Sequence, residues 1–301
     1  KGFCGSRINP TKRKKIIVSS IEHKCILESS AYVAQTQGYS LKKVRVDSNG
    51  HVDIDHLREL LSEEVLLVSV GLVNNEIGTI QNIEVISELC HDVGAILHSD
   101  FAQAPSAINL FEYCDLADLI SLSGHKFGGP MGIGALYVSR ELRNNIEPLF
   151  HGGGQELGLR SGTLALPLCV GLGSAAAYAA SEAAAHERER VRHLRDVFVT
   201  TLQSKNSAIF LNGDNLDLRH PGNANLRFIG VDAGSLLLRL QPSLSASTGS
   251  ACSSGITDPS YVLQAIGLTS DEAQSSIRFS FGHTSTEEET QNAIGTLLAH
   301  L

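Results

Sequence analysis

The chain of 301 residues predicts an α/β fold, built from a large doubly wound domain and a smaller α+β domain. Strand and helix signals alternate through the first half, as they do in a mostly parallel sheet with crossover helices. Residues 66–72 and 95–97 are nearly continuous apolar runs, which is typical of strands buried on both faces of such a sheet. After a long helical stretch, the second half mixes short strands with helices. We therefore expect a large domain over residues 1–183 and a small domain over residues 184–301.

The strands of the large domain are predicted by short segments rich in Val, Ile and Leu. They lie at residues 15–19, 42–46, 65–70, 95–99, 119–122 and 134–138. Between them, apolar residues at helical spacing predict helices or helical turns. These lie at residues 24–37, 54–61, 82–93 and 110–117. In a doubly wound sheet of this kind, ligands bind beyond the carboxyl ends of the strands.

An Ala-rich and then charged stretch over residues 166–205 predicts long helical structure that joins the two domains. Beyond it, the small domain is expected to contain strands at residues 208–211, 225–228 and 276–280. Its helices are expected at residues 234–240, 260–266 and 287–301.

Composition argues against several classes of function. The net charge of −8, without a dense patch of Lys and Arg, argues against nucleic-acid binding. No apolar segment approaches the ~20 residues that span a bilayer. The six Cys are scattered without a C-x-x-C pair, which argues against a zinc knuckle of Cys alone and against a disulfide framework. We therefore predict no metal site, no membrane partner, and a reducing, cytoplasmic location.

Polar side chains follow four of the predicted strands at the point where each strand ends. They are Glu22 with His23, Asn74 to Glu76, Asp100 with Gln103, and Ser123 to Lys126. Because the carboxyl ends of parallel strands meet at one edge of a sheet, we expect these groups to converge. A lone Lys after a strand is more often a solvated surface residue. In this setting, however, Lys126 suits a Schiff base with an aldehyde cofactor.

Cys252 lies in a run rich in Ser and Gly, residues 247–252, with no apolar face to bury its thiol. In isolation it is as readily a bystander as a nucleophile. Together with a Schiff-base Lys, it indicates chemistry on an amino acid that contains sulfur. No catalytic role is assigned to His91, His98, His151 or His283.

Six ordered blocks make the chain resemble the cysteine desulfurases, the class V group of fold-type I enzymes that use pyridoxal 5′-phosphate (PLP). The blocks are S-G-H-K at 123–126, N-N-E-I-G at 74–78, H-x-D-x-x-Q at 98–103, G-G-G-Q-E at 152–156 with R-S-G-T at 160–163, S-x-G-S-A-C at 247–252, and 258–263 with 275–280. The long loop at Cys252 resembles the subgroup that serves iron–sulfur cluster assembly. The resemblance runs along essentially the whole chain.

This resemblance implies the catalytic roles. Lys126 would hold PLP and then take the Cα proton of the substrate, while Asp100 would pair with the pyridinium nitrogen. His23 would stack on the cofactor ring and carry protons. Arg278 would clamp the substrate carboxylate. Cys252, as a thiolate, would attack the substrate sulfur, which leaves alanine and a persulfide on the enzyme.

The resemblance also implies how the cofactor is held. Asn75 and Gln103 would donate hydrogen bonds to the ring oxygen, and Asn75 would also contact the substrate. Ser123 and His125 would bind the phosphate. Thr163 would bind the phosphate of a neighbouring subunit, which implies a homodimer with twofold symmetry.

The implied activity is that of a sulfurtransferase, which converts L-cysteine to L-alanine and passes sulfur from Cys252 to an acceptor protein. Two alternatives stay open. One is a selenocysteine lyase of the same architecture, and the other is a cofactor-free or truncated non-catalytic chain that binds a partner. An ordinary aminotransferase is a weaker alternative, because transamination gives Cys252 no role.

The chain departs from the family pattern at its start. The usual opening segment, with its Ala-Thr-Thr-Pro-type sequence and its Gly-x-Thr-Glu turn for the PLP phosphate, is absent. We therefore expect an incomplete phosphate site and a chain that is found without PLP. Phe101 stands where a small residue is usual, and His283 stands where relatives often carry Arg. The C-terminal extension with which relatives dock scaffold proteins is also missing.

Overall fold

The structure is a computed structural model that describes residues 13–249 and 259–301, and these residues divide into two compact units. The first unit contains the residues up to Arg45 together with Val52–Leu72 and Gln81–Ala180, and the second contains Val46–His51, Val73–Ile80 and Ser181–Leu301. Two short segments of the N-terminal half therefore pack with the C-terminal half. The domain boundary after residue 183 stays a prediction.

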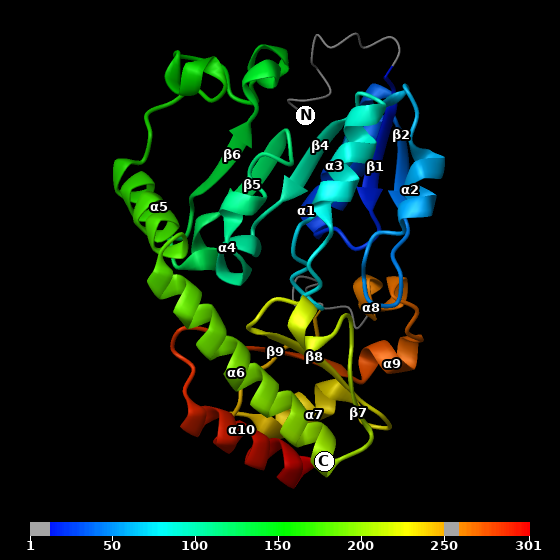
Figure 1. The fold of residues 1–301 in the computed structure, drawn as a ribbon, viewed down its shortest axis with the longest axis vertical. Coiled ribbons are helices and arrows are strands. Elements are labelled where there is room, and N and C mark those ends of the chain that lie inside the picture. Colours follow the sequence, from blue (N-terminus) through cyan, green and yellow to red (C-terminus); the bar gives the residue numbers. More distant parts are fainter. Residues whose placement is uncertain (1–12, 250–258) are drawn as a thin grey trace. The chain divides into compact units, whose positions relative to one another are not determined.

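The first unit is built on a six-stranded sheet in the order β2-β1-β3-β4-β5-β6 (Figure 1). The strands are β1 (Lys15–Ser19), β2 (Ser40–Val44), β3 (Val65–Ser69), β4 (Ile96–Asp100), β5 (Leu119–Ser123) and β6 (Gly134–Val138). Strands β1 to β5 are parallel, and β6 pairs antiparallel with β5. The predicted α/β class with a mostly parallel sheet is confirmed.

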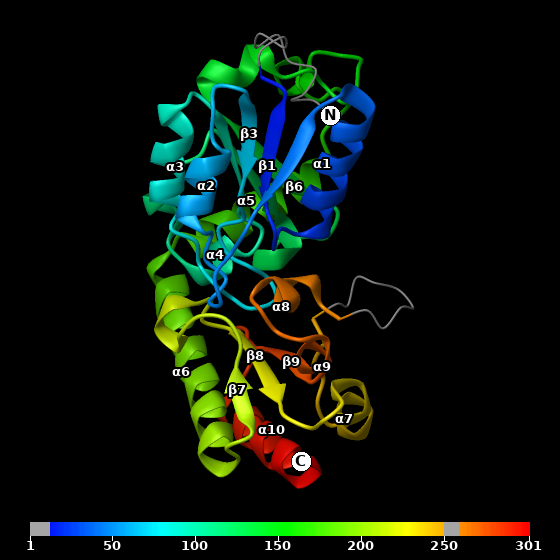
Figure 2. The ribbon, with the colours of Figure 1, turned by 90° about the vertical axis from the view of Figure 1, so that its right-hand side faces the viewer.

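Helices cover both faces of this sheet. Helix α1 (Lys24–Gln37) lies on one face, and α2 (Ile54–Leu60) and α3 (Ile83–Asp92) lie on the other (Figure 2). Val18, Val68 and Leu97 of the central strands are fully buried as a result. Double coverage explains why these strands read as continuous apolar runs.

The remaining elements of the first unit are short, apart from α5 (Leu166–Ala179). They are α4 (Ala104–Ala107) and the 3₁₀ turns η1 (Leu110–Glu112), η2 (Gly124–Phe127), η3 (Arg140–Asn145) and η4 (Gln155–Gly158). In this unit, two predictions differ from the structure by more than one residue at an end. Strand β2 begins two residues before the predicted start, and the helical turns expected over 110–117 are reduced to η1.

The second unit has a three-stranded antiparallel sheet of β7 (Ile209–Leu211), β8 (Asn223–Phe228) and β9 (Ser276–Ser280). Its helices are α6 (Glu182–Lys205), α7 (Ala233–Leu240), α8 (Tyr261–Ala265), α9 (Ser270–Gln274) and α10 (Glu287–His300), with the 3₁₀ turn η5 (Leu216–Leu218). The rings of Phe198, Phe228 and Phe279 meet in its core, with centroids 5.0 and 6.3 Å from that of Phe279. Helix α9 was not predicted, because its five residues are too few to show a helical period.

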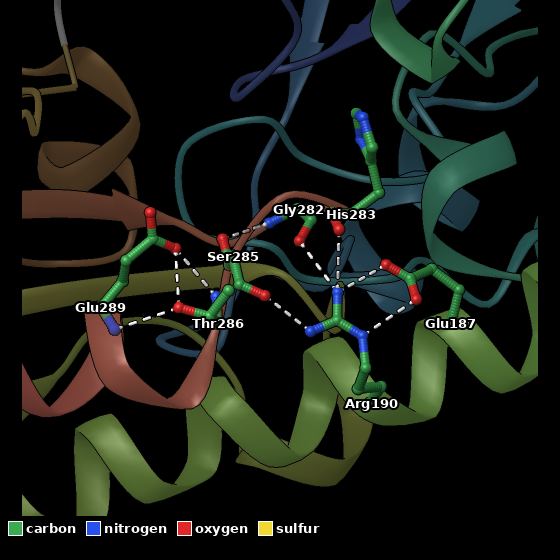
Figure 3. A network of polar contacts seen from close by, with 7 residues as sticks. All are labelled: Glu187, Arg190, Gly282, His283, Ser285, Thr286 and Glu289. Carbon is green, nitrogen blue, oxygen red and sulfur yellow. Dashed lines mark hydrogen bonds and ion pairs between the residues drawn. The ribbon is translucent and has the colours of Figure 1, made fainter.

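Arg190 on α6 binds the loop that follows β9 (Figure 3). Its Nη1 donates to the carbonyl of Ser285 at 2.6 Å, and its Nη2 donates to the carbonyl of His283 at 3.1 Å. The carboxylate of Glu187, one turn earlier on the helix, pairs with the same guanidinium at 2.7 Å. Arg190 therefore fixes the loop just before α10 begins.

We expect Arg190→Ala to lower the free energy of unfolding by about 1 kcal/mol, because it leaves these carbonyls to solvent while the pair itself is partly screened. Urea unfolding followed by circular dichroism measures the change. Arg192→Ala is the matched control, since Arg192 on the same helix makes a longer pair of 3.5 Å with Glu189. Equal losses in the two variants would show that the loop contacts add nothing.

Over the described ranges, no helix is both long enough and apolar enough to cross a membrane.

Candidate active site

Lys126 lies on a tight 3₁₀ turn, η2, at the carboxyl end of β5. The N–H of Gly129 donates to the carbonyl of Gly124 at 2.9 Å, and a Cβ at Gly129 would lie only 2.8 Å from that oxygen. The close approach requires glycine and fixes the backbone of the turn. The side chains of His125 and Lys126 are exposed, and the Ser123 hydroxyl lies 3.2 Å from Nδ1 of His125. An amine, a hydroxyl and an imidazole are thus presented together.

Asp100 is the last residue of β4 and is half-buried. Its Oδ1 accepts a hydrogen bond from the N–H of Ala102 at 2.8 Å, which orients the carboxylate. Phe101 is 1% exposed, so the large residue at this position is accommodated in the interior of the first unit. Gln103 follows at the start of α4 and is also half-buried.

Glu22 lies directly beside Asp100. Its Oε1 accepts a hydrogen bond from the N–H of Gly71 after β3, and a Cβ at Gly71 would lie 3.5 Å from the Glu22 carboxylate and 3.8 Å from Cβ of Asp100. Glu22 is 3% exposed. Burial raises the pKa of Glu22 to about 8, the negative charge of Asp100 adds to the rise, and the bond from Gly71 opposes it. Glu22 is therefore a neutral acid at pH 7.

His98 joins three neighbouring strands one layer below Asp100. Its Nδ1 lies 2.8 Å from the hydroxyl of Ser69 on β3, and its Nε2 lies 2.7 Å from the hydroxyl of Ser121 on β5. Burial lowers the pKa of His98 to about 4, while Asp100 acts in the opposite direction. Through these contacts, the neutral ring of His98 holds the end of β4 to its two neighbouring strands.

His23 is the N-cap of α1. Its Nδ1 accepts a hydrogen bond from the backbone N–H of Cys25 at 3.3 Å and lies 3.0 Å from the sulfur of the same residue. Partial burial raises the pKa of the Cys25 thiol, and the nearby Asp100 and Glu22 add to the rise. His23, Cys25, Glu22 and Asp100 therefore form one group at the carboxyl edge of the sheet.

Thr163 is exposed and lines a cavity of about 1300 Å³ in the first unit. Ser69 and His98 contribute polar groups to the cavity, whose lining is otherwise mostly apolar. A hydrogen bond joins the motif at residues 152–156 to the motif at residues 160–163. Oε1 of Gln155 accepts it from the N–H of Gly162 at 3.1 Å. This bond does not connect Thr163 to the turn that carries Lys126.

Asn75 belongs to the second unit, in the segment 73–80. The side-chain amides of Asn223 and Asn225 on β8 donate to the carbonyl of Glu76 at 3.1 and 3.2 Å. Nη1 of Arg278 on β9 donates to the carbonyl of Asn75 at 3.1 Å. The buried guanidinium of Arg219 binds the carbonyl of Ile77. The segment is therefore held through its backbone, and the half-buried Asn75 side chain is not used for this purpose.

The start of the run at residues 247–252 lies against β9. Ser247 and Arg278 exchange two backbone hydrogen bonds, of 2.7 and 3.1 Å. A Cβ at Gly249, where φ is +77°, would overlap with the buried carboxylate of Glu76, so only glycine fits. Cys252 itself lies outside the described residues.

The predicted site residues therefore gather in two groups. His23, Asp100, Gln103, Ser123, His125 and Lys126 lie at strand ends of the first unit, and Asn75 and Arg278 lie together in the second. Sequence reasoning gave Glu22 no role and did not consider Cys25 or Asn225. Glu22 had a signal in its position after the first strand, and Asn225 had one because residues 223 and 225 share one face of a strand. In the described part of the chain, no cluster of three or more His, Cys, Asp or Glu could hold a metal ion.

Comparison with known proteins identifies the family of the chain. The model of the aminotransferase class-V family matches residues 5–292. The chain belongs to this family. Cysteine desulfurase IscS of Rickettsia prowazekii is 42% identical over 292 residues, which are 96% of this chain and 70% of that relative.

Two solved structures extend the match to the class V fold. A NifS-like protein superposes with a TM-score of 0.86 at 32% identity, over 97% of this chain and 76% of the other. DndA from Streptomyces lividans gives a TM-score of 0.75 at 34% identity, over 90% and 76%. The chain is thus a member of the cysteine desulfurase group of the family, as its sequence motifs predict.

Proposed function

We propose that the chain is a PLP-dependent cysteine desulfurase that converts L-cysteine to L-alanine and passes the sulfur to an acceptor protein. The observation that carries this proposal is the joint placement of Lys126, Asp100 and His23 at the carboxyl ends of β5, β4 and β1 in one parallel sheet, in a chain 42% identical to a cysteine desulfurase. Fold alone would not support it, because one fold hosts many activities.

The donors on the sheet edge fit PLP. Lys126 offers an exposed amine, Ser123 and His125 offer a hydroxyl and an imidazole for a phosphate, and Asp100 offers a carboxylate for a ring nitrogen. When bound, PLP supplies an electron sink for bonds broken at the substrate's Cα and Cβ. Gln103, Asn75 and, from a neighbouring subunit, Thr163 complete the proposed set of cofactor ligands.

Arg278 fits a substrate carboxylate. Its Nη1 is held by the carbonyl of Asn75, whereas its Nε is buried and has no hydrogen-bond partner among the described residues. A carboxylate would accept a charge-assisted hydrogen bond from this guanidinium. The substrate class is thereby an amino acid with a free carboxylate.

Each remaining residue has a defined task in the proposed reaction. Lys126 removes the proton from Cα, and His23 orients the cofactor ring and carries a proton. The thiolate of Cys252 attacks the substrate sulfur, so that the S–S bond forms as the C–S bond breaks, and the enzyme keeps the sulfur as a persulfide. The homodimer, the acceptor protein and a cytoplasmic location are part of this proposal.

The decisive test is to add PLP to the purified chain, record its visible absorbance, and then assay alanine and sulfide after adding L-cysteine. We expect a bound-cofactor band, a change in that band with L-cysteine, and alanine production. Cys252→Ala should keep the band and its response to cysteine but lose sulfur release by a factor of about 10² or more. Cys114→Ser, which changes an exposed Cys on another segment, is the control. A band that does not respond to L-cysteine would contradict the proposal.

A further inference from the structure

The ring of His23 receives two donors at the same nitrogen. The backbone N–H of Cys25 points to Nδ1 at 3.3 Å, and the Cys25 sulfur lies 3.0 Å from that atom. A backbone N–H can only donate, so Nδ1 must offer its lone pair to it. The ring proton of the neutral imidazole then has only one place, which is Nε2.

The environment of Cys25 supports the assignment of its thiol as the second donor to Nδ1. The thiol is held in its protonated form, because partial burial and the negative charge of Asp100 both raise the pKa of Cys25. An S–H group so close to a ring nitrogen that already acts as an acceptor is a donor to the same lone pair. Both donors come from one residue at the second position of α1.

The helix depends on the same atom. His23 is the N-cap of α1, which has 14 residues, and Nδ1 is the acceptor that serves the cap. Three other titratable groups lie nearby: Asp100, Glu22, whose pKa burial raises to about 8, and Lys24, which follows His23 in the first turn. Protonation of Nδ1 would also break the cap, because the ring would no longer accept the N–H of Cys25.

We propose that Cys25 is a positioning residue that fixes His23 as the neutral tautomer with its proton on Nε2, so that His23 meets the cofactor and substrate as a hydrogen-bond donor. The inference rests on the proposed function for the identity of the partner, but the tautomer itself is a property of the chain. In this tautomer Nε2 carries the ring proton, and the lone pair of Nδ1 accepts the N–H of Cys25.

Long-range ¹H–¹⁵N correlation spectra of the 301-residue chain, recorded with and without added PLP near pH 8, test the tautomer directly. His23→Gln assigns the signals of the His23 ring by their loss. We expect a protonated Nε2 and an unprotonated Nδ1, in a single tautomer. A proton on Nδ1 in the unchanged chain would overturn the proposal.

Substitutions of Cys25 then test its role. Cys25→Pro removes both the N–H and the thiol at a position in the first helical turn that tolerates proline. It should produce a measurable population of the tautomer protonated on Nδ1, whereas Cys25→Ser, which keeps an O–H donor and the N–H, should retain the original tautomer. If Cys25→Pro does not fold, Cys25→Ala, which removes only the thiol, should give a smaller population. Spectra that are unchanged in Cys25→Pro, or in Cys25→Ala where that variant is the one used, would also overturn the proposal.

The same samples separate this inference from the proposed function. Desulfurase assays with L-cysteine run in parallel on each variant. An inactive chain whose His23 carries its proton on Nε2 would contradict the proposed function and leave the inference intact. An active chain with the opposite tautomer would do the reverse.

Discussion

Replacing Lys126 with Ala is expected to lower the turnover of L-cysteine by about 10²–10⁴-fold, from the loss of its proton transfer alone. The variant should also fail to retain PLP through gel filtration, because the amine that anchors the cofactor is gone. The turn itself should survive, since it is fixed by Gly124 and Gly129 and the Lys126 side chain is exposed. Alanine production and the absorbance of the desalted protein measure the two effects.

Lys42→Ala is the matched control for this experiment, because Lys42 is an exposed lysine on β2 of the same sheet. It should leave turnover and cofactor retention unchanged. Retention of PLP by Lys126→Ala with a turnover close to that of the unchanged chain would remove Lys126 from the reaction.

Glu22→Gln is expected to make the free energy of unfolding less dependent on pH. In the folded chain the carboxyl of Glu22 keeps its proton up to a pKa of about 8, whereas the unfolded carboxyl releases it near 4.5. The folded state thus binds more protons than the unfolded state between these values, and the stability of the unchanged chain falls as the pH rises through that window. The glutamine amide is neutral throughout and keeps an oxygen for the N–H of Gly71.

The difference in unfolding free energy between Glu22→Gln and the unchanged chain should therefore grow in favour of the variant by up to about 5 kcal/mol from pH 4.5 to pH 8. Urea denaturation at a series of pH values measures this difference. Glu28→Gln, at an exposed position on α1, is the control and should show no such trend. A constant difference for Glu22→Gln across the series would show that Glu22 ionises normally in the folded chain.

Much of the fold could be predicted because the relevant signals are local. The apolar runs at β3 and β4 follow from burial on both faces, and the start of α1 follows from a change to helical spacing after His23. Placement of Asp100 and Lys126 at strand ends follows from the same pattern, since it only requires knowing where β4 and β5 stop. The family motifs then supplied roles that the pattern could not.

Other features depend on contacts between distant residues, and no local signal marks them. The proximity of Glu22 to Asp100 requires the order in which β1, β3 and β4 pair, together with the missing side chain at Gly71. The bond from Cys25 to His23 depends on the rotamer of a capping residue. The hydrogen bonds from Asn223, Asn225 and Arg278 to the segment 73–80 join residues about 150 to 200 positions apart.

These long-range hydrogen bonds affect the order in which parts of the chain can fold during synthesis. During synthesis, the carbonyl groups of Asn75 to Ile77 emerge long before Arg219, Asn223, Asn225 and Arg278, the side chains that bind them. The second unit therefore cannot complete its interior until the segment 73–80, from the N-terminal half of the chain, packs with it. A fragment that begins at Ser181 would lack the carbonyl groups that Asn223, Asn225 and Arg278 bind, so folding of the second unit depends on residues from the N-terminal half of the chain.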